Sequence, residues 1–207
     1  MNLKYKLDDI SIQDYLEGEL ISTLKHEYID GQVYAMAGAS VSHNRIVANL
    51  VGELRSGLKN TPCEPFGSDM KVRVEDDFFY PDVTVVCHQA SNDYGVAETP
   101  VIIIEVLSKT TRKVDNTLKR LAYQSLPSLQ ELVVIEQDFV DIEVCRRANH
   151  WQSEHYYLGD EVTFSAIDVR VPVLAIYERV VNEDVTSYLK ALQDVALDDS
   201  ESVTQSR

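Results

Sequence analysis

The sequence has few of the features that mark membrane proteins, secreted proteins or proteins stabilised by a structural zinc ion. None of its apolar runs approaches the roughly 18 residues that a membrane-spanning helix needs. Its first ten residues carry charges where a secretory signal would have an apolar stretch, so we expect no signal peptide. The three cysteines, Cys63, Cys87 and Cys145, cannot all pair and form no C-x-x-C pattern. We therefore expect reduced cysteines, no zinc knuckle and a cytoplasmic location.

Positive charge is also scarce. The chain has 19 lysines and arginines against 34 aspartates and glutamates, which gives a net charge of −15. Such a field repels nucleic acid at long range, so composition alone argues against DNA binding. The sequence also has no glycine-rich phosphate loop, no helix-turn-helix signature and no RNA-binding aromatic motif.

The rest of the composition is that of an ordinary globular domain. The 207 residues are 44% hydrophobic and 26% charged, which is enough to build a core and excludes wholesale disorder. We find no internal repeat, and we expect one domain over residues 1–182. An acidic C-terminal segment follows over residues 183–207, with six acids and two cations. Val185–Leu197 is predicted to form a helix, and the residues beyond it a solvated tail.

The hydrophobic pattern predicts an α/β (α+β) fold, a mixed β-sheet flanked by helices. An Asp30-Gly31 turn between apolar flanks predicts an N-terminal hairpin over residues 27–34. Ser40 and Ser42 are both plausible N-caps of a helix whose apolar residues recur every four positions. Those apolar residues are Ile46, Leu50, Leu54 and Leu58.

Further strands and one more helix follow from the same patterns. The predicted strands cover residues 70–74, 82–86, 101–107, 132–135 and 140–145. The run at 101–107 is apolar on both faces, which is typical of a central strand. A helix is predicted from about Arg112 to Ser125, with Val114, Leu118 and Leu121 on its apolar side.

Glu105 is the first candidate functional residue. It lies in a seven-residue strand whose other six members are valine, isoleucine or leucine. A carboxylate at such a position is costly unless a cation or a metal ion compensates its charge. A metal site and a buried salt bridge both satisfy that condition.

Asp82 is the second candidate, since it follows Tyr80-Pro81 at the start of an apolar strand. If that strand lies beside the Glu105 strand, two carboxylates come together, and hard oxygen ligands suit Mg²⁺ or Mn²⁺. The alternative for Asp82 is a simple strand-start or turn-capping acid.

The helix after Glu105 supplies a polar stripe. Asp115, Lys119 and Tyr123 recur at i, i+4 and i+8 and therefore share one helix face. This face can point at the strand end that carries the carboxylates. The alternative is an exposed Asp–Lys pair of little energetic weight.

Taken together, these residues resemble a known family. Pro81-Asp82, then Glu105-Val106-Leu107-Ser108, then Asp115, Lys119 and Tyr123 are similar in order and spacing to the Uma-type, restriction-endonuclease-like family of the PD-(D/E)XK nuclease superfamily. The resemblance covers about Glu27 to Arg147 and includes His43. The superfamily's lysine two residues after the acid is Leu107 here. The family shares this departure, and Lys119 is the implied replacement.

The resemblance implies a restriction-endonuclease-like core and a metal-dependent endonuclease that cleaves phosphodiester bonds, with DNA as the first substrate candidate. Asp82 and Glu105 would bind Mg²⁺ or Mn²⁺, which activates a water, and Lys119 would orient that water or offset phosphate charge. The implied supporting residues are Glu27, His43, Ser108, Asp115 and Tyr123.

Access of DNA to so acidic a protein needs a local basic surface. Lys109, Arg112 and Lys113 follow Glu105 closely and would contact phosphates, giving weak, salt-sensitive binding. Cleavage of two strands with one site per chain favours a two-fold homodimer.

Two other functions remain open from the sequence. One is a catalytically silent binding or regulatory module on a nuclease fold, which the negative net charge favours. The other is a hydrolase of RNA or another phosphate ester, since the same chemistry serves each. Metal-dependent stabilisation separates the silent module from the enzymes.

Overall fold

The computed structural model describes residues 9–36, 38–88, 92–107 and 115–204. Its centre is a six-stranded sheet in the order β11-β10-β9-β8-β6-β3. The apolar strand with Glu105 is β8, antiparallel to β6 and parallel to β9. The predicted central strand and the mixed α+β fold are therefore confirmed. The strands are β3 Cys63–Gly67, β6 Val83–Cys87, β8 Pro100–Leu107, β9 Glu131–Glu136, β10 Ile142–Arg146 and β11 Ser153–Tyr156.

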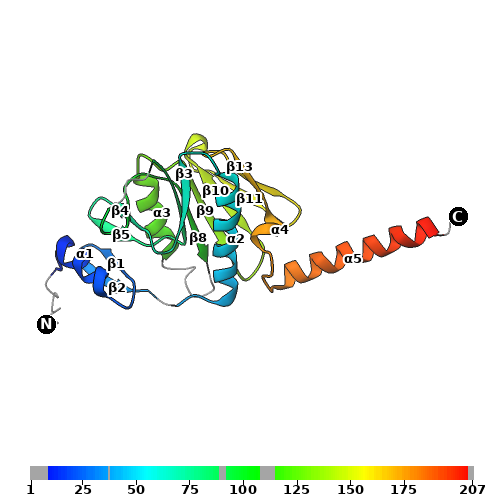
Figure 1. The fold of residues 1–207 in the computed structure, drawn as a ribbon, viewed down its shortest axis with the longest axis horizontal. Coiled ribbons are helices and arrows are strands. Elements are labelled where there is room, and N and C mark those ends of the chain that lie inside the picture. The colour runs from blue at the N-terminus through cyan, green and yellow to red at the C-terminus, as the bar shows by residue number, and fades with distance from the viewer. Residues whose placement is uncertain (1–8, 37, 89–91, 108–114, 205–207) are drawn as a thin grey trace, which may run out of the picture.

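A second sheet, in the order β2-β1-β5-β4-β7, lies at the N-terminal side of the molecule beside helix α1 (Figure 1). The predicted hairpin is β1–β2, and its turn residues Asp30 and Gly31 have φ values of 49° and 76°. Positive φ at both positions is what a two-residue hairpin turn requires. The bounds are α1 Ile12–Ile21, β1 His26–Ile29, β2 Gln32–Ala35, β4 Lys71–Val74, β5 Asp77–Phe79 and β7 Val96–Ala97.

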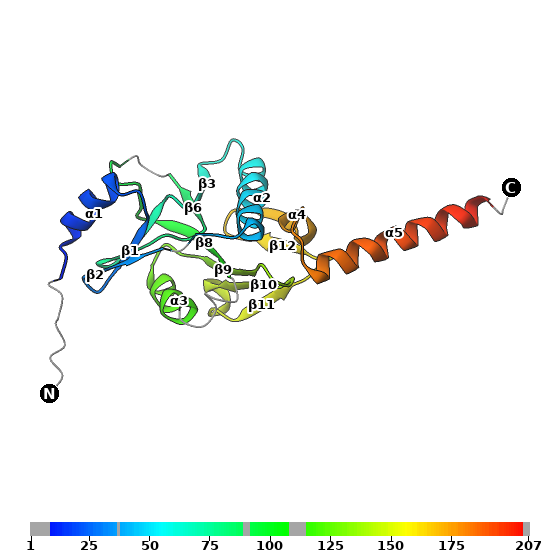
Figure 2. The same ribbon diagram turned by 90° about the horizontal axis from the view of Figure 1, so that it is seen from below.

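Helix α2, Val41–Gly57, covers one face of the central sheet, and α3, Asp115–Ser125, covers the other (Figure 2). Ser40 caps α2, since its Oγ accepts a hydrogen bond from the backbone N of His43 at 3.1 Å. Ile46, Leu50 and Leu54 are fully buried in the core between α2 and the sheet. The predicted apolar stripe of α2 is thus confirmed, and Ser40 rather than Ser42 is the cap.

The prediction for the apolar side of α3 is wrong. Leu118 and Leu121 are 70% and 63% exposed, whereas Tyr123 is 1% exposed. Val114 lies outside the described residues. The helix instead buries Lys119 and Tyr123, because their side chains reach carboxylates on the two sheets.

The expectation of reduced cysteines is wrong for one pair. Cys63 on β3 and Cys87 on β6 are register partners in the antiparallel ladder and are joined by a disulfide. Cys145 is free and buried. The two cysteines are 24 positions apart in the sequence, and the pairing could not be predicted because only the strand order brings them together.

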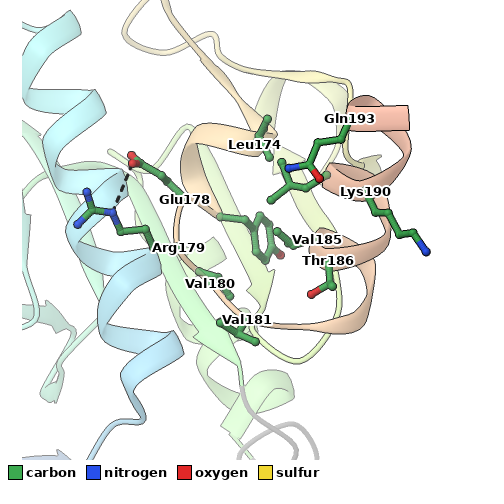
Figure 3. Close-up of a pocket in the computed structure, with 11 residues that line it drawn as sticks. Leu174, Glu178, Arg179, Val180, Val181, Val185, Thr186, Lys190 and Gln193 are labelled. Atoms are coloured by element: carbon green, nitrogen blue, oxygen red, sulfur yellow. Dashed lines mark ion pairs between the residues drawn. The ribbon is translucent and has the colours of Figure 1, made fainter. Parts of the chain in front are cut away.

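The C-terminal part of the chain completes the core and then leaves it. The strands β12 and β13 form a hairpin that packs, with the short helix α4, on the α2 side of the sheet. Helix α5 runs from Glu183 to Thr204, beyond the predicted end at Leu197, and projects from the body (Figures 1 and 2). Val180 and Val185 are buried together at its base (Figure 3). The remaining bounds are η1 Arg147–Asn149, β12 Glu161–Phe164, β13 Val169–Pro172 and α4 Val173–Ile176.

None of the helices, within the described residues, combines the length and the apolarity that crossing a membrane requires.

Candidate active site

Two carboxylates meet where β6 begins and β8 ends. Val83 on β6 pairs with Ile104 on β8, which brings the preceding Asp82 alongside Glu105. The backbone N of Val106 donates a hydrogen bond to Asp82 Oδ2 at 2.7 Å. The side chains of Asp82 and Glu105 are only 13% and 15% exposed. The strand order therefore produces the proximity on which the predicted carboxylate pair depends.

Helix α3 brings two residues of its polar stripe to Glu105. Tyr123 donates its hydroxyl hydrogen to Glu105 Oε1 at 2.8 Å, and Lys119 Nζ lies 3.8 Å from the same oxygen. Lys119 Nζ is closer to Glu27, at 2.7 Å from Oε1. A simple Glu105–Lys119 salt bridge therefore does not account for this geometry, because the ammonium group is shared between two carboxylates.

Glu27 enters the site from the second sheet. It lies on β1, is 7% exposed and accepts a hydrogen bond from the backbone N of Tyr80 at 3.2 Å. The Tyr80 hydroxyl in turn donates to Glu19 at 2.9 Å. Neither Tyr80 nor Glu19 was among the candidate residues predicted from the sequence, although the Tyr80-Pro81-Asp82 run places Tyr80 beside a candidate ligand. Tyr80 thus links the hairpin that carries Glu27 to the strand that follows Asp82.

His43 approaches Asp82 from the first turn of α2. Its Nε2 lies 3.1 Å from Asp82 Oδ1. Burial acts to lower the pKa of His43, but the hydrogen bond and charge of Asp82, with the charge of Glu105, raise it overall. The other ring nitrogen, Nδ1, is buried and has no hydrogen-bond partner among the described residues. A buried ring nitrogen without a partner is a potential contact for a ligand.

Negative charge dominates the electrostatics of the site. The pKa of Glu105 is raised to about 7, first by burial and also by the charges of Asp82 and Glu27, while the charge of Lys119 and the hydrogen bond from Tyr123 act to lower it. The pKa of Tyr123 is also raised, first by burial and then by the charge of Glu105. Three carboxylates thus converge on one lysine and one histidine, so an added cation would find a favourable field.

The remaining sequence predictions are not placed in this geometry. Ser108, Lys109, Arg112 and Lys113 lie outside the described residues. Asp115 is the first residue of α3, and its side chain also lies outside the described part. In the portion of the chain that the structure describes, no group of three or more histidine, cysteine or acidic side chains is arranged as a metal site. The candidate donor set is therefore the pair Asp82 and Glu105.

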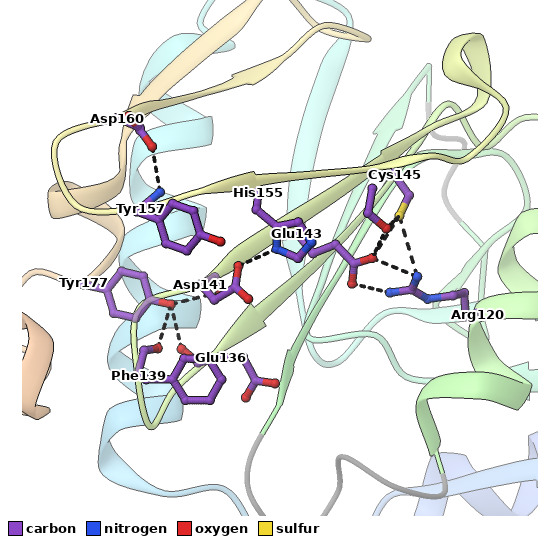
Figure 4. Close-up of polar contacts among 11 residues, drawn as sticks. Arg120, Glu136, Phe139, Asp141, Glu143, Cys145, His155, Tyr157, Asp160 and Tyr177 are labelled. Atoms are coloured by element: carbon purple, nitrogen blue, oxygen red, sulfur yellow. Dashed lines mark hydrogen bonds and ion pairs between the residues drawn. The ribbon is translucent and has the colours of Figure 1, made fainter.

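A second ion pair fixes α3, and with it Lys119, against the sheet. Arg120 Nη1 donates to Glu143 Oε1 at 2.9 Å, and its Nη2 donates to the other oxygen (Figure 4). Ser153 on β11 also donates to Glu143, which lies on β10. A bidentate arginine–carboxylate pair restricts orientation as well as distance. The Arg120–Glu143 pair therefore helps to set the direction from which Lys119 enters the site.

This pair predicts a specific loss of stability in acid. Burial acts to raise the pKa of Glu143, but hydrogen bonds from Arg120 and Ser153 outweigh it and lower the pKa to about 2. Because the folded pKa lies below the ordinary value, the stabilisation is complete above about pH 5 and is lost as the pH falls toward 2. After allowance for solvent screening, we expect the charged Glu143 to contribute about 1–2 kcal/mol to the free energy of unfolding. Urea unfolding between pH 7 and pH 3 measures the loss of this contribution.

The matched variants are Glu143→Gln and Glu161→Gln, the latter at an exposed position of β12. Glu143→Gln is expected to flatten the dependence of unfolding free energy on pH, and Glu161→Gln to leave it unchanged. An identical slope in wild type and Glu143→Gln would contradict the assignment.

Comparison with known proteins gives three kinds of match. Residues 12–171 match the model of the Uma2 family, described as "Putative restriction endonuclease". "Uncharacterized protein sll1609" of Synechocystis sp. (strain PCC 6803) is 33% identical over 148 residues, 69% of this chain and 80% of that protein. "Uncharacterized protein slr1290" of the same organism is 31% identical over 173 residues, 81% of this chain and 91% of that protein.

The solved structures include one with the same fold. It is the crystal structure of a protein described as "a putative nuclease belonging to DUF820" from Anabaena variabilis ATCC 29413. The two structures align with a TM-score of 0.69 at 18% sequence identity, over 83% of this chain and 99% of the other. At this identity the match shows a shared fold.

Proposed function

The chain belongs to the Uma2 family of restriction-endonuclease-like proteins, and from this premise we propose that it is a metal-dependent endonuclease that hydrolyses DNA phosphodiester bonds. The observation that carries the proposal is the convergence at Glu105. Asp82 lies across the strand pair, Tyr123 donates to the Glu105 carboxylate, and Lys119 is shared with Glu27. Such a combination of buried acids and a lysine is suited to phosphoryl chemistry.

The donor set fits a hard divalent cation. Asp82 and Glu105 offer carboxylate oxygens, the ligand type that Mg²⁺ and Mn²⁺ prefer, and Mg²⁺ commonly keeps several waters beside one or two carboxylates. These two residues would therefore hold the ion. When bound, the ion supplies Lewis acidity toward the phosphate and the attacking water.

Lys119 and its partners act on the phosphate. The ammonium group of Lys119 would orient the attacking water or offset the charge that develops on the phosphate oxygens. Glu27, at 2.7 Å from Nζ, holds this group in place. Tyr123 fixes the orientation of the Glu105 carboxylate through its hydrogen bond. Glu27 and Tyr123 are thus positioning residues.

His43 has a related role. Asp82 holds Nε2, which leaves the buried Nδ1 for a water or a phosphate oxygen.

The protein's net charge of −15 opposes the approach of DNA, so binding is expected to be weak and steeply salt-dependent. Lys109, Arg112 and Lys113 would supply the local phosphate contacts, and a two-fold dimer would let two sites act on opposite strands.

The direct test is cleavage of supercoiled plasmid DNA by the full chain. We expect nicked and linear products with Mg²⁺ or Mn²⁺ and none with EDTA. Thermal unfolding is expected to shift upward with Mn²⁺ in the wild type and not in Asp82→Asn, because an ion that binds only the folded state stabilises it. A shift without cleavage of DNA or RNA would indicate another phosphate ester. No shift and no cleavage would favour the silent binding module and refute the proposal.

A further inference from the structure

The first turn of helix α2 carries backbone N–H groups without a partner. The first N–H groups of any helix have no carbonyl one turn earlier to bind. In α2 the backbone N of His43 donates to Ser40 Oγ at 3.1 Å, and that of Asn44 donates to Ser40 O at 3.1 Å. The N–H groups of Val41 and Ser42 have no hydrogen-bond partner among the described residues. Val41 is 67% exposed, so this end of the helix is open to solvent.

A buried glutamine brings a further unused donor to the same helix end. Gln137 is 8% exposed, and Ser40 Oγ donates to its Oε1 at 2.6 Å. Its Nε2 has no hydrogen-bond partner in the part of the chain that the structure describes, yet this atom is not sealed from solvent. Because the two amide atoms share one carbon, Nε2 lies no more than about 5 Å from Ser40 Oγ. A buried donor of this kind is a potential contact for a ligand.

The position of Gln137 is fixed by its backbone and by the segment that follows it. Its backbone N donates to Leu107 O at 3.1 Å, just beyond the paired ends of β8 and β9. Its backbone O accepts a hydrogen bond from Asn182 Nδ2 at 3.5 Å, and Asp184 accepts one from the backbone N of Val140 at 2.8 Å. These contacts hold the segment after β9 against the base of α5. The glutamine amide is therefore preorganised, and a ligand would not have to order it.

This helix end lies beside the carboxylate site. His43 joins the two, because its backbone N binds the Ser40 cap and its Nε2 lies 3.1 Å from Asp82 Oδ1. The first turn of α2 contains no acid, so no side chain of that turn opposes the positive end of the helix dipole. Free N–H groups at a helix N-terminus are suited to phosphate, and backbone N–H groups and glutamine side chains commonly contact the phosphates of DNA.

We propose that the start of α2 and Gln137 form a phosphate-binding subsite, which takes the phosphodiester group next to the one at the carboxylates on the same DNA strand. The donors are the N–H groups of Val41 and Ser42, the hydroxyl of Ser42 and the Nε2 of Gln137. The subsite positions the strand and takes no part in bond cleavage. Its assignment to DNA rests on the proposed nuclease function, whereas the binding of a phosphate group as such does not.

Val41→Pro removes one of these donors and keeps the helix. Val41 is the first residue of α2, where proline is favoured, and Ser40 has φ −72° and ψ 167°, the extended conformation that a residue before proline adopts. Val41→Ala is the matched control, because it shortens the same side chain and retains the N–H group.

Gln137→Glu tests the side-chain donor. The variant keeps an acceptor for the Ser40 hydroxyl but replaces the amide donor with a negative charge. A helix N-terminus stabilises such a charge, so the folded variant is expected to be at least as stable as the wild type while it repels phosphate. A merely structural role of Gln137 would not separate stability from binding in this way.

The first measurement is the fluorescence anisotropy of a labelled DNA duplex with the full chain, at low salt and in EDTA, which removes the metal ion that cleavage is proposed to need. We expect Val41→Pro to raise the Kd about fivefold, Gln137→Glu to raise it about tenfold or more, and Val41→Ala to leave it unchanged. The second measurement is thermal unfolding in inorganic phosphate against chloride at equal ionic strength. Phosphate is expected to stabilise the wild type and Val41→Ala, and neither of the other two variants.

The two probes separate this subsite from the nuclease function. Phosphate-specific stabilisation without DNA binding would support the subsite for a free phosphate group and overturn its assignment to DNA. A wild type that responds to neither probe would overturn the proposal. So would equal affinities of the wild type, Val41→Pro and Gln137→Glu for DNA, or an effect of Val41→Ala as large as that of Val41→Pro.

Discussion

Replacement of Glu105 by glutamine is expected to lower the rate of DNA cleavage by about a thousandfold. The change preserves side-chain size and can still accept the hydrogen bond from Tyr123, but it removes the charge that faces Lys119 and a bound cation. Asp82→Asn and Lys119→Met are expected to have effects of similar size, because each removes one charged member of the same constellation. Nicking of supercoiled plasmid in Mg²⁺ is the measurement.

The control for Glu105→Gln is Glu98→Gln, which alters an exposed carboxylate just before the start of the same strand, β8. Glu98→Gln should cleave as the wild type does. Thermal unfolding must show that the Glu105 variant is folded, and we expect no loss of stability, because burial already disfavours the charged form of this group. A folded Glu105→Gln variant with full activity would remove Glu105 from the mechanism.

Replacement of Arg146 by methionine is expected to destabilise the fold by about 3–5 kcal/mol. Arg146 donates to Glu131 Oε1 at 3.0 Å and to the backbone O of Thr163 at 2.7 Å, and it also donates to Glu154. Without it, Glu131, whose side chain is 2% exposed, keeps a buried carboxylate with no cation beside it. The midpoint of thermal unfolding should fall by about 10 °C.

The pairing itself is tested by a second change. Burial raises the pKa of Glu131, and Arg146 opposes that rise. The double variant Arg146→Met with Glu131→Gln is therefore expected to recover much of the loss, because the buried charge is gone. Arg170→Met, at an exposed position of β13, should change stability by less than about 0.5 kcal/mol. A single Arg146 variant as stable as Arg170→Met would show that the buried pair contributes little.

Local patterns in the sequence were enough to predict most of the elements around the site. The Asp30-Gly31 turn specifies its hairpin because both residues adopt positive φ at low cost. Glu105 was conspicuous because a charge inside an apolar strand needs compensation wherever that strand lies. Asp82 stood out at the start of an apolar strand and Lys119 on a polar helical stripe, and the family resemblance then implied their roles. These signals depend on residue type and short spacing, which do not require a tertiary structure.

The face that α3 buries could not be read from its own periodicity. Leu118 and Leu121 are the more apolar choice, yet they are exposed, and Lys119 and Tyr123 point inward. Two buried carboxylates, Glu27 and Glu105, need a cation and a hydrogen-bond donor beside them, and this need decides which face of α3 turns inward. Only the tertiary structure places those acids beneath the helix.

The sequence by itself therefore determined the order of the elements and the residue types available for chemistry, because hydrophobic period and turn geometry act locally. The tertiary structure decided which of those residues meet. The Lys119–Glu27 pair joins α3 to a different sheet, the Cys63–Cys87 disulfide joins strands 24 residues apart, and Asp184 fixes the direction of α5. Each is a contact between segments distant in the chain, and strand order and packing, rather than local pattern, bring such segments together.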